Sequence, residues 1–218
     1  MKLQSAERRK PMKKAKAVAC LFIDIGGVLL TDGWDLEARK RSANKFRLNW
    51  AELEERHHLV FETYENGILT LEQYLDLVIF YRQRAFTRAQ WRRFMFAQSR
   101  PYPEMLELVA RLKARHRLKV VVISNEAREL NAYRIRKFDL DTIADVFISS
   151  CFVHVRKPDE RMFRLALDIA QVQAWETVYI DNTQMFVDIA RGLGIRSVMH
   201  TNCTSSREKL AAFGLSSG

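Results

Sequence analysis

The segment LFIDIGGVLL, residues 21–30, places one aspartate, Asp24, in an otherwise apolar run and follows it with two glycines. Continuous rather than alternating hydrophobicity predicts a strand that is buried on both faces, here over residues 17–25. An ionised carboxylate is costly to bury unless a cation or hydrogen bonds compensate it. The rest of the chain therefore has to explain how Asp24 is tolerated at the end of a core strand.

Four further short runs, rich in β-branched residues, have the same character. They cover residues 118–125, 145–150, 177–182 and 196–200. Segments with helical periodicity separate and follow them, at 102–115, 127–138, 158–172, 183–192 and 204–212. Strands that alternate with helices form a parallel sheet covered on both faces. The sequence therefore predicts an α/β protein with a doubly wound, Rossmann-like parallel sheet.

A long helical segment interrupts this alternation after the first strand. No strand signal is present between residues 32 and 100, where helical patterns cover 35–47, 50–64, 70–82 and 87–98. Thr70 and Thr87 precede two of these helices as N-cap residues. Aromatic residues are dense here and fit the core of a small helical bundle. We therefore expect a helical cap over 32–100, a catalytic core formed by 17–31 and 101–218, and a basic tail over 1–16.

The net charge of +10 is concentrated at the beginning of the chain. Residues 1–17 contain seven Lys or Arg residues against one Glu and so carry six of the ten net positive charges. A solvated basic tail accounts for this distribution, so we do not expect a nucleic-acid partner.

We expect no targeting signal in this sequence. Asp24 interrupts the apolar run that would otherwise imitate a secretory signal, and no stretch approaches the roughly 18 apolar residues of a membrane span. Three widely spaced cysteines form neither a disulfide framework nor a metal-binding pair. We expect a soluble, cytoplasmic protein without a membrane partner; the sequence carries no signal for an oligomeric state.

Polar residues of complementary chemistry stand where the predicted strands end. In an open parallel sheet, ligands bind beyond the carboxyl ends of the strands, so residues at these ends meet at one edge. They are Asp24 after the first strand, Ser124 and Asn125 at the second, Lys157 in the loop after the third, and Asp181 and Asn182 at the fourth.

With these motifs the chain resembles the haloacid dehalogenase-like hydrolase superfamily, most of whose members are Mg²⁺-dependent phosphatases. The resemblance covers about residues 17–214. It rests on Asp24-Ile25-Gly26-Gly27-Val28, on VVISN with Ser124, on RKPD with Lys157, and on YIDN with Asp181 and Asn182. The insertion matches the position of the family's four-helix cap. The stretches GGVLLTDGW and SSCFVHVRKPD resemble an uncharacterised bacterial subgroup.

The resemblance implies a phosphatase acting on a small phosphorylated metabolite. Asp24 would attack phosphorus to form an aspartyl-phosphate, while Lys157 offsets charge repulsion and Ser124 donates to a phosphoryl oxygen. Mg²⁺ would be held by Asp24, the carbonyl of Gly26 and an oxygen of the pair Asp181 and Asn182. The expected substrate-binding residues are Ser124, Asn125, Lys157 and Gly27. The lysine and the metal would neutralise Asp24, and the two glycines would let the backbone approach the phosphate.

Two departures from the family pattern bear on activity. Gly26 stands where the family usually has a second aspartate, the general acid for the leaving group. The absence of this aspartate should lower the rate roughly 10²–10⁴-fold for a poor leaving group. Asn182 replaces a metal-ligating acid, so one negative charge is missing. Asp32 could replace the absent acid, although the preferred interpretation is that it caps the next turn, TDGW.

Two alternatives to a phosphatase remain open. A haloacid dehalogenase would tolerate Gly26, because a halide leaves without protonation, but dehalogenases of this superfamily need no metal and usually lack the acid that Asp181 supplies. A degenerate member would bind a phosphorylated ligand or a partner without turnover. The histidines are interpreted as structural or surface residues: His57, His58, His116, His154 and His200. Cys151 and Cys203 are interpreted as packing residues.

Overall fold

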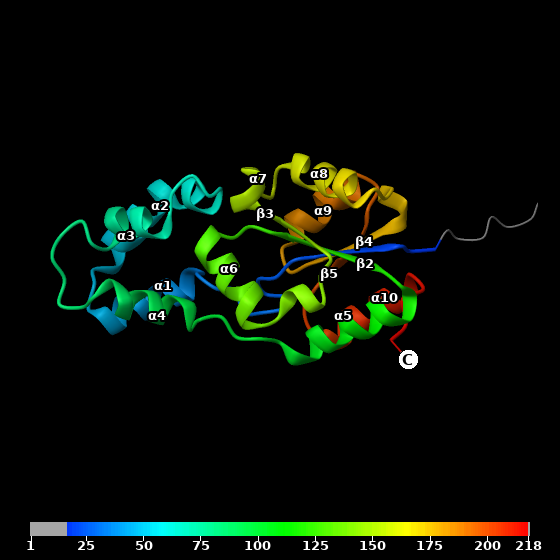
Figure 1. Cartoon of the computed structure of the whole chain (residues 1–218), viewed down its shortest axis with the longest axis horizontal. Coiled ribbons are helices and arrows are strands. Elements are labelled where there is room, and N and C mark those ends of the chain that lie inside the picture. The colour runs from blue at the N-terminus through cyan, green and yellow to red at the C-terminus, as the bar shows by residue number, and fades with distance from the viewer. Residues whose placement is uncertain (1–16, 218) are drawn as a thin grey trace, which may run out of the picture.

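A computed structural model of the chain describes residues 17–217, so the predicted tail over 1–16 lies outside the described residues. Its centre is a five-stranded parallel sheet in the order β3-β2-β1-β4-β5 (Figure 1). The strands are β1 (Cys20–Ile23), β2 (Lys119–Ser124), β3 (Val146–Ser149), β4 (Thr177–Asp181) and β5 (Arg196–Met199). The chain moves outward from β1 to β3, then returns to the other side of β1. The predicted doubly wound sheet is confirmed.

Helices cover both faces of the sheet. Side chains of β1 alternate between two clusters, with Leu21 and Ile23 on one face and Cys20 and Phe22 on the other. The first face packs against α5 (Pro103–His116) and α10 (Cys203–Ala212), and the second against α8 (Glu160–Ala170) and α9 (Gln184–Gly192). Burial on both faces explains why the strand sequences are continuously apolar.

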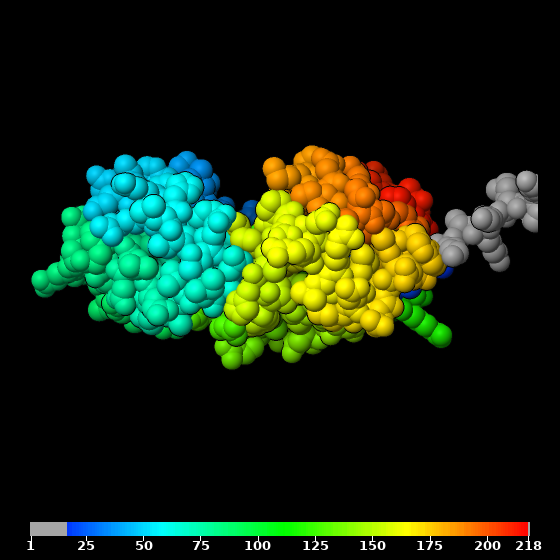
Figure 2. All heavy atoms as spheres, turned by 90° about the horizontal axis from the view of Figure 1, so that it is seen from above, coloured from blue at the N-terminus to red at the C-terminus, as the bar shows by residue number. Residues whose placement is uncertain are grey.

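Four helices follow β1 and gather beyond the carboxyl ends of the strands, where Figure 2 shows them as a separate lobe (blue to green). They are α1 (Leu36–Phe46), α2 (Trp50–Glu65), α3 (Leu71–Val78) and α4 (Arg88–Phe96). The expected N-caps are present, since Thr70 and Thr87 each close a capping box with the glutamine three residues later. The aromatic residues form the core of this lobe around the fully buried Trp91.

Helix α6 (Arg128–Lys137) follows β2 and joins the lobe to the sheet. Its residue Leu130 packs into the same apolar cluster as Trp91, although α6 lies outside the inserted segment. Two short 3₁₀ helices, η1 (Leu140–Thr142) and η2 (Ala174–Glu176), connect later elements.

The structure differs from the sequence-based expectation at two places. Helix α3 ends at Val78 rather than at residue 82, because the chain turns there and Phe80 packs edge-on against Phe86. A short helix that was not predicted, α7 (Ser150–Val153), follows β3 directly. Among the helices of residues 17–217, none is both long and apolar enough to cross a membrane.

Candidate active site

A cavity of about 330 Å³ lies between the carboxyl ends of the strands and the four-helix lobe. Its floor includes Asp24, Ser124, Lys157 and Asn182, and its roof includes residues of α2 and α4. The structure thus brings together residues from three strand ends and from the loop after β3, as the parallel topology requires.

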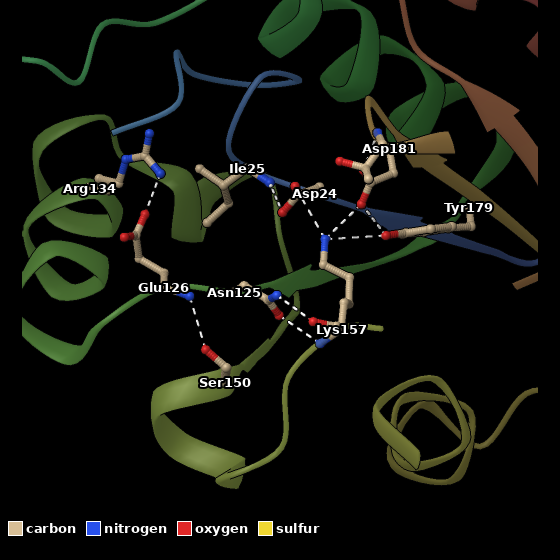
Figure 3. A network of polar contacts seen from close by, with 10 residues as sticks. Asp24, Ile25, Asn125, Glu126, Arg134, Ser150, Lys157, Tyr179 and Asp181 are labelled. Carbon is tan, nitrogen blue, oxygen red and sulfur yellow. Dashed lines mark hydrogen bonds and ion pairs between the residues drawn. The ribbon is translucent and has the colours of Figure 1, made fainter. Parts of the chain in front are cut away.

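One lysine lies between two carboxylates at the centre of this floor (Figure 3). Lys157 Nζ is 3.2 Å from Asp24 Oδ2 and 2.7 Å from Asp181 Oδ2. Its side chain is 1% exposed, and its Nζ is also 3.3 Å from the hydroxyl of Tyr179. Because the ammonium is shared, the group of three carries a net negative charge when both carboxylates are ionised.

The pKa values of this group reflect burial and mutual charge. The pKa of Asp24 is raised to about 7, chiefly by burial and also by the charge of Asp181, against the opposing effect of Lys157. Burial acts to lower the pKa of Lys157, but the two carboxylates outweigh it and raise that pKa. Lys157 therefore stays charged, while the Asp24 carboxylate needs more positive charge than Lys157 provides.

Asp181 is turned away from the cavity. Its Oδ1 accepts from the backbone N–H of Thr183 at 2.7 Å, and its Oδ2 accepts from Lys157 and from the hydroxyl of Tyr179. The residue is fully buried and does not line the cavity. Of the four metal ligands expected from the sequence, the structure brings Asp24, Gly26 and Asn182 to the cavity wall, but not Asp181.

Asn125 clamps the backbone of Lys157. Its Nδ2 donates to the Lys157 carbonyl at 2.8 Å, and its Oδ1 accepts from the Lys157 N–H at 2.8 Å (Figure 3). Asn125 lines the cavity beside Ser124, but its side-chain bonds go to the protein. It therefore positions the lysine, a role that was not predicted.

The two glycines after Asp24 make room for neighbouring side chains. A Cβ on Gly27 would lie 1.9 Å from Asn182 Nδ2, and the φ of Gly27 is +69°. Gly27 itself does not line the cavity. Asn182 can pack there only because Gly27 has no side chain. The expected direct contact of Gly27 with a substrate is therefore not supported by its position.

Asp32 lies against Gly26. A Cβ on Gly26 would be 3.0 Å from Asp32 Oδ1, and Asp32 lines the cavity. Asp35 rather than Asp32 caps α1, through the N–H of Ala38, so the interpretation of Asp32 as a cap is wrong. Within the described part of the chain, the Asp32 carboxylate has no hydrogen-bond partner. Partial burial in the cavity and the charge of Asp35 raise its pKa, while Arg134 lowers it.

Arg134 contacts the cavity lining and both chain segments that connect the lobe to the sheet. Its guanidinium is fully buried and pairs with Glu126, which lines the cavity (Figure 3). It also donates to the carbonyl of Thr31 and, at 3.1 Å, to Ser99 Oγ. Thr31 and Ser99 belong to the two chain segments that enter and leave the lobe, so one residue fixes both.

The oxygen donors on the cavity wall suit a hard divalent cation. Within residues 17–217, no three His, Cys, Asp or Glu side chains gather into a metal-binding group. Asp24, Gly26 and Asn182 line the cavity and can offer a carboxylate, a backbone carbonyl and an amide oxygen. Mg²⁺ commonly takes one or two carboxylates and keeps several waters, so this set fits Mg²⁺ with a small protein contribution.

His57 is a cavity residue that sequence reasoning missed. It is 7% exposed, lines the cavity from α2, and its Nδ1 lies 2.9 Å from the hydroxyl of Tyr74. Its neighbour His58 faces away, toward Glu54. The helical periodicity of this segment predicts only that one face of α2 is buried. It does not indicate which residue of that face borders a cavity.

The other histidines have structural contacts. His116 contacts the carbonyl of Ser216, His154 that of Asn66, and His200 the hydroxyl of Ser206. Cys151 and Cys203 are buried, and burial raises the pKa of the Cys151 thiol to about 12, which keeps it in the unreactive thiol form.

Comparison with known proteins gives one family match that covers most of the chain. The sequence model of the haloacid dehalogenase-like hydrolase family matches residues 18–194. Acyl-CoA dehydrogenase family member 10 of Mus musculus is 25% identical over 100 residues. That match covers 46% of this chain and 9% of the mouse protein, so the chain spans only a small part of this relative's length.

Solved structures share the fold. A HAD family enzyme from Bacteroides thetaiotaomicron has a TM-score of 0.73 and 23% identity, over 85% of this chain and 95% of that one. That enzyme has also been solved in complex with magnesium and inorganic phosphate. An L-2-haloacid dehalogenase has a TM-score of 0.60 and 19% identity, over 83% of each chain. At these identities the likeness establishes the fold.

Proposed function

Because this chain belongs to the haloacid dehalogenase-like hydrolases, we propose that it hydrolyses a small phosphate monoester with Mg²⁺, through a phosphorylated Asp24. The observation that carries the proposal is the shared ammonium of Lys157, which lies 3.2 Å from Asp24 at the floor of a cavity lined by oxygen donors. Two anions, a nucleophile and a phosphate, can meet there only if cations offset their repulsion.

Each residue of the site has a separate role in the proposed reaction. An Asp24 oxygen forms a bond to phosphorus while the bond to the leaving-group oxygen breaks, and water later releases phosphate and restores the carboxylate. Lys157 holds Asp24 in place and offsets the charge of the phosphoryl oxygens. Ser124, buried at the cavity floor, donates its hydroxyl to a phosphoryl oxygen. Mg²⁺ held by Asp24, Gly26 and Asn182 would supply the positive charge that Lys157 cannot supply alone.

Asp32 is the residue best placed to give a proton to the leaving group. Its carboxylate occupies the space beside Gly26 where a side chain of that residue would begin, and it has no hydrogen-bond partner within the described residues. Burial in the cavity and the charge of Asp35 raise its pKa, which is the direction that a general acid needs. Asp32 would therefore supply the general acid that is missing at position 26.

The cavity supports a substrate of metabolite size. A volume of about 330 Å³ is near the lower end of small-molecule sites. We propose a small phosphorylated metabolite as the partner, and a reducing, cytoplasmic setting in line with the three free cysteines.

Hydrolysis of nitrophenyl phosphate tests this function. We expect turnover that requires Mg²⁺, is abolished by chelator, and is lost in Asp24→Asn without loss of the fold by circular dichroism. Turnover at the wild-type rate in Asp24→Asn would exclude the mechanism. Halide release from a 2-haloacid without metal would identify a dehalogenase instead, and binding of phosphate esters without turnover would identify a non-catalytic member.

A further inference from the structure

A chain of hydrogen bonds fixes the proton on His57. Trp34 Nε1, which can only donate, lies 3.0 Å from the hydroxyl oxygen of Tyr74, and that hydroxyl lies 2.9 Å from His57 Nδ1. Tyr74 is fully buried, so its own hydroxyl proton needs an acceptor. Within the described residues, His57 Nδ1 is the acceptor within reach. His57 Nδ1 is therefore unprotonated, and the ring proton is on Nε2.

The His57 ring is held neutral. Burial, with contributions in the same direction from Arg39 and His58 and against the opposing charge of Glu54, lowers the pKa of His57 to about 3. Arg39 and Glu54 form an ion pair at 2.8 Å, which limits what Glu54 can offer the ring. A neutral imidazole with its proton on Nε2 is a hydrogen-bond donor, and no residue in the described part of the chain accepts from it.

The surroundings of His57 suit an uncharged, oxygen-bearing group. The rings of Trp34 and Phe61 line the same cavity, and Phe61 stacks on His57 with centroids 5.4 Å apart. Tyr64 also lines the cavity, is 3% exposed, and its hydroxyl has no hydrogen-bond partner among the described residues. A buried hydroxyl without a partner is costly, so this side of the cavity wall is short of hydrogen-bond partners for polar groups.

The charges around the cavity disfavour a second anion. The lining contains five carboxylates and three cationic side chains. Each of the three cations pairs with a carboxylate, Arg134 with Glu126, Arg156 with Glu65, and Lys157 with Asp24, although Arg156 Nε has no hydrogen-bond partner among the described residues. A leaving group with its own negative charge would lie among these carboxyl groups, and each cationic side chain of the lining already has a carboxylate partner.

From these observations we propose that His57 is a specificity-determining residue, which donates a hydrogen bond from Nε2 to an oxygen of an uncharged leaving group. The inference rests on the proposed phosphatase function and adds the substrate class: phosphate monoesters whose alcohol portion carries hydroxyl groups and no second anionic group. Tyr74 is the positioning residue that keeps the proton on Nε2.

Aryl phosphates that differ in one ring substituent test the inference. Phenyl phosphate is compared with its meta- and para-hydroxymethyl and meta-carboxy derivatives, which leave the ester bond and the ring unchanged. We expect kcat/KM to be about five- to tenfold higher for the better hydroxymethyl ester than for phenyl phosphate, the effect of one neutral hydrogen bond. We expect the carboxy ester to fall below phenyl phosphate.

Two variants separate recognition from structure. In His57→Gln the amide nitrogen can reach the place of Nε2, so the preference for the hydroxymethyl ester should largely persist. In His57→Asn the shorter amide can keep the contact with Tyr74 but cannot reach the cavity, so the preference should disappear. The control is His58→Phe, because His58 lies outside the cavity on the same helix and should keep the wild-type preference.

The possible failures are distinguishable. Absence of turnover of every aryl phosphate overturns the proposed function. Turnover with no preference for a hydroxymethyl ester, or with a preference that His57→Asn retains, overturns only the inference about His57. If both His57 variants unfold, Tyr74→Phe decides: it frees Nδ1 to take the ring proton, so the nitrogen resonances of His57 should show a change of tautomer and the hydroxymethyl preference should fall.

Discussion

The carboxylate of Asp32 lies in the space that a side chain on Gly26 would enter, with Oδ1 3.0 Å from the position of a Cβ on that glycine. A residue six positions later in the chain thus brings an acid to the place where the sequence has none. We expect Asp32→Asn to slow hydrolysis of an alkyl phosphate by about 10²-fold or more, and that of nitrophenyl phosphate far less, because nitrophenolate leaves without a proton. The measurement is kcat/KM for both esters in both proteins.

The double variant Gly26→Asp with Asp32→Ala is the matched control, since it returns an acid to position 26 and removes the side-chain oxygen that it would collide with. Partial recovery of alkyl phosphate hydrolysis would support a role in proton transfer. An equal loss for both esters in Asp32→Asn would mean that Asp32 does not protonate the leaving group.

Lys157 lies between Asp24 and Asp181, so under the proposed mechanism it serves as a structural as well as a catalytic cation. Lys157→Met keeps most of the side-chain volume but leaves two buried carboxylates facing each other. We expect a loss of at least about 10²-fold in kcat/KM. We also expect a loss of about 3–5 kcal/mol in the free energy of unfolding at pH 8, because breaking a buried pair leaves an uncompensated charge. The loss should shrink toward pH 5, since burial raises the pKa of Asp24 and the protonated form needs no cation.

Lys113→Met is the comparison for this effect. Lys113 pairs with Asp145 at 2.7 Å on the surface, where ion pairs contribute about 0–1 kcal/mol. A Lys157→Met protein as stable as Lys113→Met would show that the central lysine does not neutralise the buried carboxylates.

The strand ends could be predicted from the sequence, but the contacts of their neighbours could not. Asp24, Ser124 and Asp181 follow apolar runs whose register is set by burial on both faces, so the topology alone brings them to one edge. Asn125 adjoins Ser124 and looks equally catalytic, yet its two hydrogen bonds go to the backbone of Lys157. Which way it turns depends on the loop after β3, a tertiary contact that no local pattern encodes.

The roof of the cavity illustrates the same limit. Periodicity correctly predicted the helices, because an amphipathic face repeats every three to four residues. It could not separate His57, at the cavity, from His58, at the surface, except by noting that adjacent residues on a helix point about 100° apart. The contact of Asp32 with Gly26 depends on the turn between β1 and α1. This turn contains Gly27 at a positive φ and has no helical or strand periodicity from which the contact could be predicted.

The buried, neutral His57 predicts a pH dependence of stability. Its pKa of about 3 in the folded protein lies below the ordinary value of about 6.5, so the unfolded chain takes up a proton first as the pH falls. Stability is therefore lost as the pH falls from about 6.5 toward 3, by about 1.4 kcal/mol per pH unit for one group. We expect the free energy of unfolding of the wild type to fall more steeply over this range than that of His57→Gln, by urea denaturation at several pH values. Parallel slopes would mean that His57 titrates as it does in the unfolded chain.

Asn182 predicts weak metal binding. Its side chain packs over Gly27 and lines the cavity, but its amide offers an oxygen without a charge, and Asp181, the neighbouring carboxylate, is committed to Lys157, Tyr179 and Thr183. Asp24 is then the main source of negative charge for a cation, and Mg²⁺ gives up its waters reluctantly. We expect an apparent affinity nearer millimolar than micromolar by calorimetry, and a gain of about tenfold or more in Asn182→Asp.

Asp188→Asn distinguishes this arrangement from a different set of ligands. Asp188 is the next carboxylate along the chain after Asp181, but its Oδ1 accepts from Gln184 and Arg191 on the surface of α9, away from the cavity. Its removal should leave the Mg²⁺ titration unchanged. If Asn182→Asp binds Mg²⁺ no better than the wild type while Asp188→Asn binds it worse, Asn182 does not hold the metal and α9 must turn Asp188 toward the site when Mg²⁺ binds.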